Sequence, residues 1–480
     1  MVPGSVRGSR LAIMQFVRTA KSEAAAAARI GARLGARKRR ELLVALGPCF
    51  ARTEPWLQAG KYVGALVSGL PKRNGWTIAE HAGDRAPDRT QRLLNRAVWD
   101  TFAAMGVVRR FAVAGLAEAA RRGGRRGGLV IGALDETGQE KAGTATAGVQ
   151  RQYLGCAGKV ANGINTVHLA YVREHAGHAL IGARQWIPRA QIEDPVQSLL
   201  MGLPPGLVFR TKGQLAIDIA AEALGDGIRF DFFCGDEVYG SCTELRAFLE
   251  DRGQGYVLRV PKTFRLTLAS GQRLTCADAA SLLAGTRHGE VRSAGKGSKG
   301  ERWYAWSWLA TASPRHCLLI RRHLATGEPA FHYCHVPAGQ PLTLTRMIRA
   351  AGLRWPVEEQ FRAGKDCFGL DQAQVRLYTA IARHTVLVMA AAAICAITAA
   401  LLRHRTSAQA PLPIRPGQPP PADPGMIALT VPEIARLLSG PAPPGLAGHW
   451  LDWRRRHQAL ARWYHHRTRL ARDADIALVR

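Results

Sequence analysis

Apolar residues follow a helical spacing through the first quarter of the chain. From Glu41 to Ala120 they recur at the three- and four-residue intervals of a buried helix face, with no convincing strand between them. Residues 1–120 are therefore predicted to form an N-terminal all-α domain.

The pattern changes after a Gly/Arg-rich linker at 121–128. Short apolar runs, typical of buried strands, then alternate with helical stretches. The predicted strands are 129–134, 165–172, 178–187, 230–234 and 256–260, and the predicted helices are 212–224 and 240–252. This succession predicts an α/β fold over residues 129–261, in which a mixed sheet is flanked by helices.

The remaining segments differ in composition. Residues 262–341 are rich in strand and turn residues, and a helical pattern returns over 342–405. A Pro-rich linker at 406–424 and a basic helical tail at 425–480 follow. The helical part contains Val386–Leu402, an uncharged, alanine-rich run at the lower length limit of a membrane span. We interpret it as a buried core helix and expect no membrane partner.

A helix-turn-helix pattern lies inside the first segment. A short helix at 77–82 is followed by a turn containing Gly83 and Pro87, and then by a longer helix at 88–100. The second helix carries a basic stripe at positions i, i+3 and i+7, formed by Arg89, Arg92 and Arg96. Such a stripe is also the ordinary solvated face of a bundle helix, but the charge of the whole chain favours contact with DNA.

That charge is large. The chain of 480 residues carries a formal net charge of +30, which raises the local concentration of polyanions and favours nucleic acid as a partner. The nine cysteines are scattered and contain no Cys-x-x-Cys pair, which is typical of a reducing compartment and argues against a disulfide framework or a zinc finger.

Three acidic residues lie where catalysis would need them. Asp135 and Asp236 each follow a predicted strand, and carboxylates at the carboxyl ends of neighbouring strands suit oxygen-loving Mg²⁺. Glu358 follows Pro356 near a predicted helix start. Arg362 and Lys365 are expected on the same face as Glu358, although an ordinary surface salt-bridge ladder has the same spacing. Glu359 is the neighbouring competitor, and it should point roughly 100° away.

The acidic blocks resemble those of insertion-sequence transposases of the DDE type. Asp135-Glu-Thr-Gly, with Arg151-Gln-Tyr-Leu-Gly-Cys-Ala-Gly-Lys159 after it, resembles the family's first-aspartate block, and Gly235-Asp-Glu-Val-Tyr-Gly240 resembles the second. Arg354-x-x-x-Glu358-x-x-x-x-x-x-Lys365 matches the family signature Tyr-x-x-Arg-x-x-x-Glu-x-x-x-x-x-x-Lys. Two positions depart from the family: Ala351 replaces the signature tyrosine, and Glu136 stands where aspartate is more usual.

The resemblance implies an RNase H-like mixed sheet flanked by helices, interrupted by a β-rich insertion at 262–341. It implies that Asp135, Asp236 and Glu358 bind two Mg²⁺ ions, for which Mn²⁺ could substitute, and catalyse DNA cleavage and strand transfer, as in cut-and-paste transposition. Arg354 and Lys365 would contact the scissile phosphate. The further phosphate-contact candidates are Arg362, Lys159 and Lys212.

The implied partners are double-stranded DNA, as terminal inverted repeats and as target, and a second copy of the chain in a homodimer on paired ends. The implied setting is a bacterial cytoplasm, beside the nucleoid. Two alternatives remain: a non-catalytic, transposase-derived DNA-binding regulator or architectural protein, and a metal-dependent nuclease without strand transfer. The alternating Trp303, Trp306 and Trp308 in the insertion are interpreted as strand packing, with stacking on an extruded base as the alternative.

Overall fold

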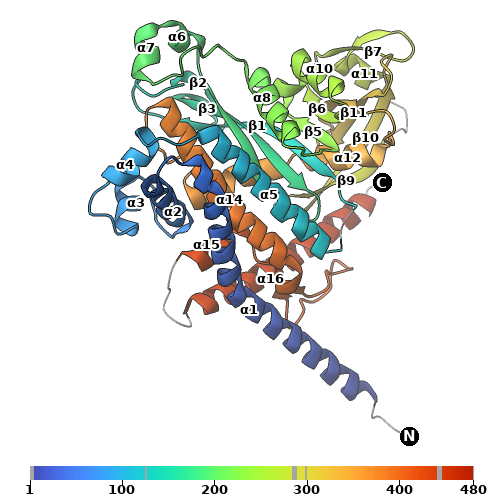
Figure 1. The fold of residues 1–480 in the computed structure, drawn as a ribbon. Helices are drawn as coiled ribbons and strands as arrows, with labels where there is room; N and C mark the ends of the chain where they lie inside the picture. The colour runs from blue at the N-terminus through green and yellow to red at the C-terminus, as the bar shows by residue number, and fades with distance from the viewer. Residues whose placement is uncertain (1–4, 125–126, 284–288, 298–299, 440–445, 479–480) are drawn as a thin grey trace.

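A ten-stranded sheet forms the centre of the computed structural model, which describes residues 5–124, 127–283, 289–297, 300–439 and 446–478 (Figure 1). Its strands are β1 (Val130–Glu140), β2 (Gln150–Leu154), β3 (Lys159–Arg173), β4 (Gly177–Trp186), β5 (Phe232–Gly235), β6 (Tyr256–Val260), β9 (Glu290–Gly297), β10 (Gly300–Ala310), β11 (His316–His323) and β12 (Pro329–His335). Two short pairs lie outside this sheet: β7 (Arg265–Thr267) with β8 (Arg273–Thr275), and β13 (Ala408–Gln409) with β14 (Gly425–Met426).

The strand order is that of an RNase H-like core. β1, β3 and β4 form an antiparallel meander, in which β3 lies between β1 and β4. β5 then pairs with β1 in parallel, and β6 pairs with β5 in parallel. The predicted α/β class and mixed sheet are confirmed. The segment predicted as a β-rich insertion supplies β12, β11, β10 and β9, which continue the same sheet beyond β6.

The first strand is longer than the sequence predicts. It continues past Leu134 to Glu140 because β3 pairs with it along its whole length, up to Glu140 opposite Gly163. Asp135 therefore lies within β1 instead of ending it. The polar residues after Leu134 hide this extension from an analysis based on apolar runs.

Helices cover the sheet. The N-terminal part contributes α1 (Ser5–Leu46), η1 (Gly47–Cys49), α2 (Thr53–Val67), α3 (Gly75–His81), α4 (Asp88–Asn95) and α5 (Thr101–Arg122). The central part contributes α6 (Arg189–Glu193), α7 (Pro195–Leu200), α8 (Lys212–Gly225), α9 (Glu237–Gly240), α10 (Thr243–Asp251) and α11 (Cys276–Leu282). The last part contributes α12 (Leu344–Gly352), α13 (Pro356–Phe368), α14 (Tyr378–Thr406), α15 (Val431–Leu438) and α16 (Leu446–Leu478).

Helix α14 is the apolar centre of this arrangement. It packs against β4 and against α1, α2, α4, α5, α13 and α15. Among the described residues it is the one helix long and apolar enough to cross a membrane by length and composition, and 89% of its most apolar window is buried inside the protein. The run at Val386–Leu402 is therefore a core helix of this fold.

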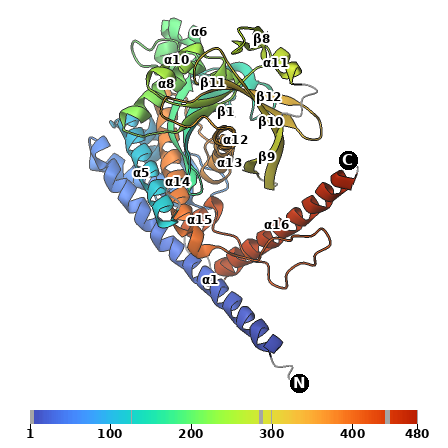
Figure 2. The ribbon, with the colours of Figure 1, turned by 90° about the vertical axis from the view of Figure 1, so that its right-hand side faces the viewer.

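The two terminal helices differ in their contact with the sheet. The beginning of α1 projects away from it (Figure 2), whereas α16 contacts β10. Near its start, α16 is tied to the body by the guanidinium of Arg455, which donates hydrogen bonds to the carbonyls of Ile427 and Thr406.

Candidate active site

Asp135 and Asp236 lie on the two neighbouring parallel strands at the centre of the sheet. β5 pairs with β1 only from Ile131 to Ala133, so β1 runs on past the end of its partner. Asp236 follows β5 directly and caps α9, accepting the backbone N–H of Val238 at 3.0 Å.

A third carboxylate, Glu136, joins the two aspartates. Ligand oxygens of Asp135, Glu136 and Asp236 lie within 4.8 Å of one another. Glu136 is held by two donors, because the ammonium of Lys212 lies 2.6 Å from Oε1 and the hydroxyl of Tyr239 donates to Oε2 at 2.8 Å. Sequence reasoning treated Glu136 only as a departure from the family pattern. Its place in the cluster follows from its contacts with Lys212 and Tyr239, which are distant in the sequence.

Glu358 reaches this cluster through an arginine. The guanidinium of Arg354 donates to Asp135 Oδ2 at 2.8 Å and to Glu358 Oε1 at 3.2 Å. Glu359 turns away, and its carboxylate lies 3.4 Å from the imidazole of His178 on β4. Of the two adjacent glutamates, Glu358 is thus the one on the side of Asp135.

The carboxylates raise one another's proton affinity. Burial, opposed by Arg354 and reinforced by Asp236 and Glu136, raises the pKa of Asp135 to about 7. Burial and then the charge of Glu136 also raise the pKa of Asp236. The two buried aspartates therefore hold a proton more tightly than exposed ones, and the charge of Arg354 opposes this effect at both.

This donor set fits a hard divalent cation. Carboxylate oxygens are the ligands that Mg²⁺ and Mn²⁺ prefer, and a bound cation would stabilise the ionised form of these carboxylates, whose pKa values burial raises. Asp135 and Asp236 are the residues best placed to hold it, with Glu358 available once Arg354 releases its carboxylate. The Nε–H of Arg354 is buried without a partner among the described residues, which leaves a donor for an anionic ligand.

A family model described as a DDE superfamily endonuclease matches residues 45–297, more than half of the chain. The chain belongs to this endonuclease family. The match contains Asp135 and Asp236 and ends before Glu358. Among solved structures, the chain is similar to a cryo-EM structure of the piggyBac transposase synaptic complex with hairpin DNA. That likeness has 9% sequence identity and a TM-score of 0.40, and it covers 84% of this chain and 76% of the other. Comparison with curated proteins finds no match.

Two of the predicted phosphate contacts bind residues of β1. Lys365 donates to the carbonyl of Gly138 at 3.2 Å, farther along β1 from Asp135. Lys212 also reaches the cluster, but it is bound to Glu136. Its ammonium therefore helps to build the site, and it is not a free phosphate contact.

The other two predicted contacts do not join the cluster. The side chain of Arg362 is 77% exposed and lies 3.5 Å from Asp366. Arg362 lies four residues after Glu358 on α13, on the same helical face as predicted, and it pairs with Asp366 at the surface. Lys159 is exposed at the start of β3 and makes no contact with the acidic residues among the described part of the chain.

The predicted basic stripe divides into two parts. Helix α4 ends at Asn95, before the predicted end at residue 100. Arg89 and Arg92 line one cavity with Lys61, whereas Arg96, which follows the helix, lines another. The helix ends early because its last carbonyls, those of Leu93 and Leu94, accept hydrogen bonds from the buried guanidinium of Arg383 on α14 in place of a further helical turn.

Proposed function

We propose that this endonuclease is a transposase that binds the terminal inverted repeats of an insertion sequence and catalyses Mg²⁺-dependent cleavage and strand transfer by a cut-and-paste route. The observation that carries the proposal is the carboxylate cluster of Asp135 and Asp236, linked by Arg354 to Glu358. It lies at the carboxyl end of β5 in an RNase H-like sheet, in a chain of the DDE endonuclease family.

The acidic residues would hold two Mg²⁺ ions, which supply activation of a water or of a DNA 3′-hydroxyl and charge stabilisation of the leaving oxygen. Arg354 balances the acidic charge in the cation-free chain. With cations bound to the carboxylates, its forked guanidinium would be free to bind a phosphate of the scissile strand. Lys365, held beside β1 by Gly138, offers a second positive charge along the same strand.

DNA is the partner that the charge favours. A net charge of +30 makes two copies of the chain repel until phosphates neutralise them. Joining two ends to one target needs two active sites in a fixed relation, for which a two-fold dimer on paired ends is the simplest arrangement. All nine cysteines are free thiols, which supports a setting in the reducing bacterial cytoplasm.

Cleavage of a DNA fragment that carries both ends of the element, with Mg²⁺ present, tests the proposal. Asp135→Asn, Asp236→Asn and Glu358→Gln should each abolish cleavage but retain DNA binding, because the phosphate contacts come from basic residues. Glu359→Gln is the matched control and should cleave as the unmodified chain does. Cleavage by Glu358→Gln together with its loss in Glu359→Gln would assign the third carboxylate to Glu359.

A further inference from the structure

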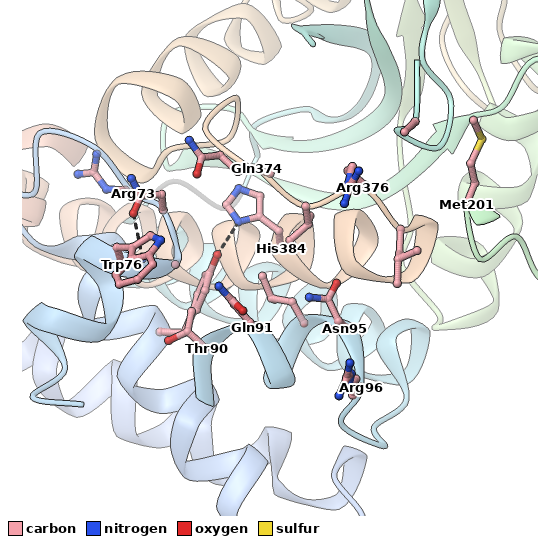
Figure 3. A pocket seen from close by; sticks show the side chains of 18 of the residues that line it. Arg73, Trp76, Thr90, Gln91, Asn95, Arg96, Met201, Gln374, Arg376 and His384 are labelled. Carbon is pink, nitrogen blue, oxygen red and sulfur yellow. Dashed lines mark hydrogen bonds between the residues drawn. The ribbon is translucent and has the colours of Figure 1, made fainter. Parts of the chain in front are cut away.

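A large cavity separates the N-terminal helices from the segment that follows the catalytic helix α13. It has a volume of about 980 Å³ and is lined by residues of α2, α3 and α4 on one side and of the loop 369–377 on the other. In Figure 3, Trp76 lies at one end, Arg96 and Arg376 lie toward the other, and Gln91, Asn95 and His384 lie between them.

The charged side chains in the described lining of the cavity are all arginines. The described lining contains no aspartate or glutamate. Arg96 and Arg376 are exposed and make no ion pair or side-chain hydrogen bond with the described part of the chain. Two guanidiniums without an acidic partner in this cavity attract negative charge. The cavity therefore favours an anionic ligand.

The rest of the lining offers contacts for bases. The indole of Trp76 is 68% exposed and has no ring contact among the described residues, which leaves its face open for stacking. The amide side chains of Gln91, Asn95 and Gln374 likewise make no hydrogen bond within the described ranges. Asn and Gln amides match the donor and acceptor edges of bases. Aromatic, amide and guanidinium groups together favour nucleic acid over an acidic peptide.

The walls of the cavity are preformed. His384 Nε2 lies 2.9 Å from the carbonyl of Gly369, which can only accept, so Nε2 donates and Nδ1 accepts the hydroxyl of Tyr62 at 2.9 Å. This chain of hydrogen bonds joins α2, α14 and the loop 369–377. The same loop is also held by Gln372, which accepts the backbone N–H of Arg73 at 2.7 Å.

The cavity is also connected to the active site. Gln139 and Lys141, at the far end of β1 from the sheet centre, both donate to the carbonyl of Ala373 in the cavity wall. Lys141 lies about 20 Å beyond Asp135 along the extended chain. A DNA strand that follows β1 from the carboxylates past Lys365 would reach the cavity.

We propose that this cavity binds an unpaired stretch of DNA strand, with a base stacked on Trp76 and phosphates bound by Arg96 and Arg376. This inference rests on the proposed function, since it assumes DNA as the substrate. It assigns to Arg96 a role separate from that of Arg89 and Arg92, which face the other cavity.

Binding by the full-length chain in EDTA, measured by fluorescence anisotropy, tests the inference without cleavage. The probes are a labelled single-stranded oligonucleotide and a duplex of the same sequence. Trp76→Ala should weaken single-strand binding about tenfold, as removal of one base–aromatic stack does, whereas Trp76→Phe should retain it. Duplex binding should stay near that of the unmodified chain. Arg96→Gln with Arg376→Gln should lower the salt dependence of single-strand binding by about 0.7 for each phosphate that is no longer bound.

An exposed tryptophan outside the cavity provides a matched control. Trp450 on α16 is 47% exposed, and Trp450→Ala should leave single-strand affinity unchanged. Unchanged affinity in Trp76→Ala, an equal loss in a control, or an equal weakening of duplex and single strand would overturn the inference. A chain that binds neither form of DNA would overturn the proposed function as well. Normal DNA binding with no effect of Trp76→Ala overturns the cavity assignment alone.

Discussion

Arg354 is the residue whose removal most directly tests the charge balance of the site. Its guanidinium lies 2.8 Å from Asp135 and 3.2 Å from Glu358, and its side chain is 24% exposed. Arg354→Gln removes the positive charge that lies between Asp135 and Glu358. We expect the variant to be destabilised in EDTA and restored by Mg²⁺, because a divalent ion supplies the missing charge at the same carboxylates.

The size of the effect follows from the geometry. Two unit charges about 3 Å apart at an effective dielectric constant of about 20 attract by roughly 5 kcal/mol before desolvation is counted. Removing one partner of a largely buried pair costs about 3–5 kcal/mol in net stability. A chain of 480 residues unfolds with an entropy near 1 kcal/mol/K, so the Tm should fall by about 3–5 °C.

Thermal unfolding monitored by tryptophan fluorescence, in EDTA and in Mg²⁺, measures the difference. The control is Arg362→Gln, since Arg362 pairs with Asp366 at the surface, where its side chain is 77% exposed; its Tm should change by less than about 1 °C. Equal Tm values for Arg354→Gln and the unmodified chain in EDTA would refute the charge-balance argument. So would a deficit that Mg²⁺ leaves unchanged.

Three further predictions follow from the buried polar groups. Burial raises the pKa of Asp135 from 3.8 to about 7, so Mg²⁺ affinity measured by calorimetry should increase as the pH rises to about 7. The stability of the cation-free chain should instead decrease as the pH rises from about 4 to about 7, because the unfolded state loses this proton at the lower pH. Lys212→Met removes a donor 2.6 Å from Glu136, and thermal unfolding should show a loss of about 1–3 kcal/mol. Tyr62→Phe leaves Nδ1 of the buried His384 unpaired, which should cost about 1–3 kcal/mol in the same assay.

Local sequence patterns were enough to predict the strands next to which the two aspartates lie. A buried strand is a short apolar run, and β6 has the predicted bounds because its apolar pattern begins and ends sharply. The placement of Asp236 after β5 follows from the same signal. Fold class and the two central aspartates therefore depend on information within a few residues of each position.

Contacts between distant segments could not be predicted in this way. Glu136 enters the cluster because Tyr239 and Lys212, from distant segments, meet it there. Arg362 keeps the helical face of Glu358 but pairs with the exposed Asp366 one turn farther along. Helical spacing fixes which residues share a face of a helix, but not which of them find a partner elsewhere.

Helix α14 contacts both α4, the helix proposed to bind DNA, and α13, the helix that carries Glu358. Its Arg383 donates to the carbonyl of Leu94 at 3.0 Å and to that of Trp99 at 3.3 Å, which fixes the end of α4. The next residue, His384, binds the carbonyl of Gly369 at the end of helix α13. Adjacent residues of one buried helix thus hold the proposed DNA-reading helix and the helix that carries Glu358. Because both bonds are buried, α4 lies at a fixed distance from the carboxylates. If α4 binds DNA and the carboxylates cleave it, as proposed, the fold itself sets the position of the cut relative to the bound sequence.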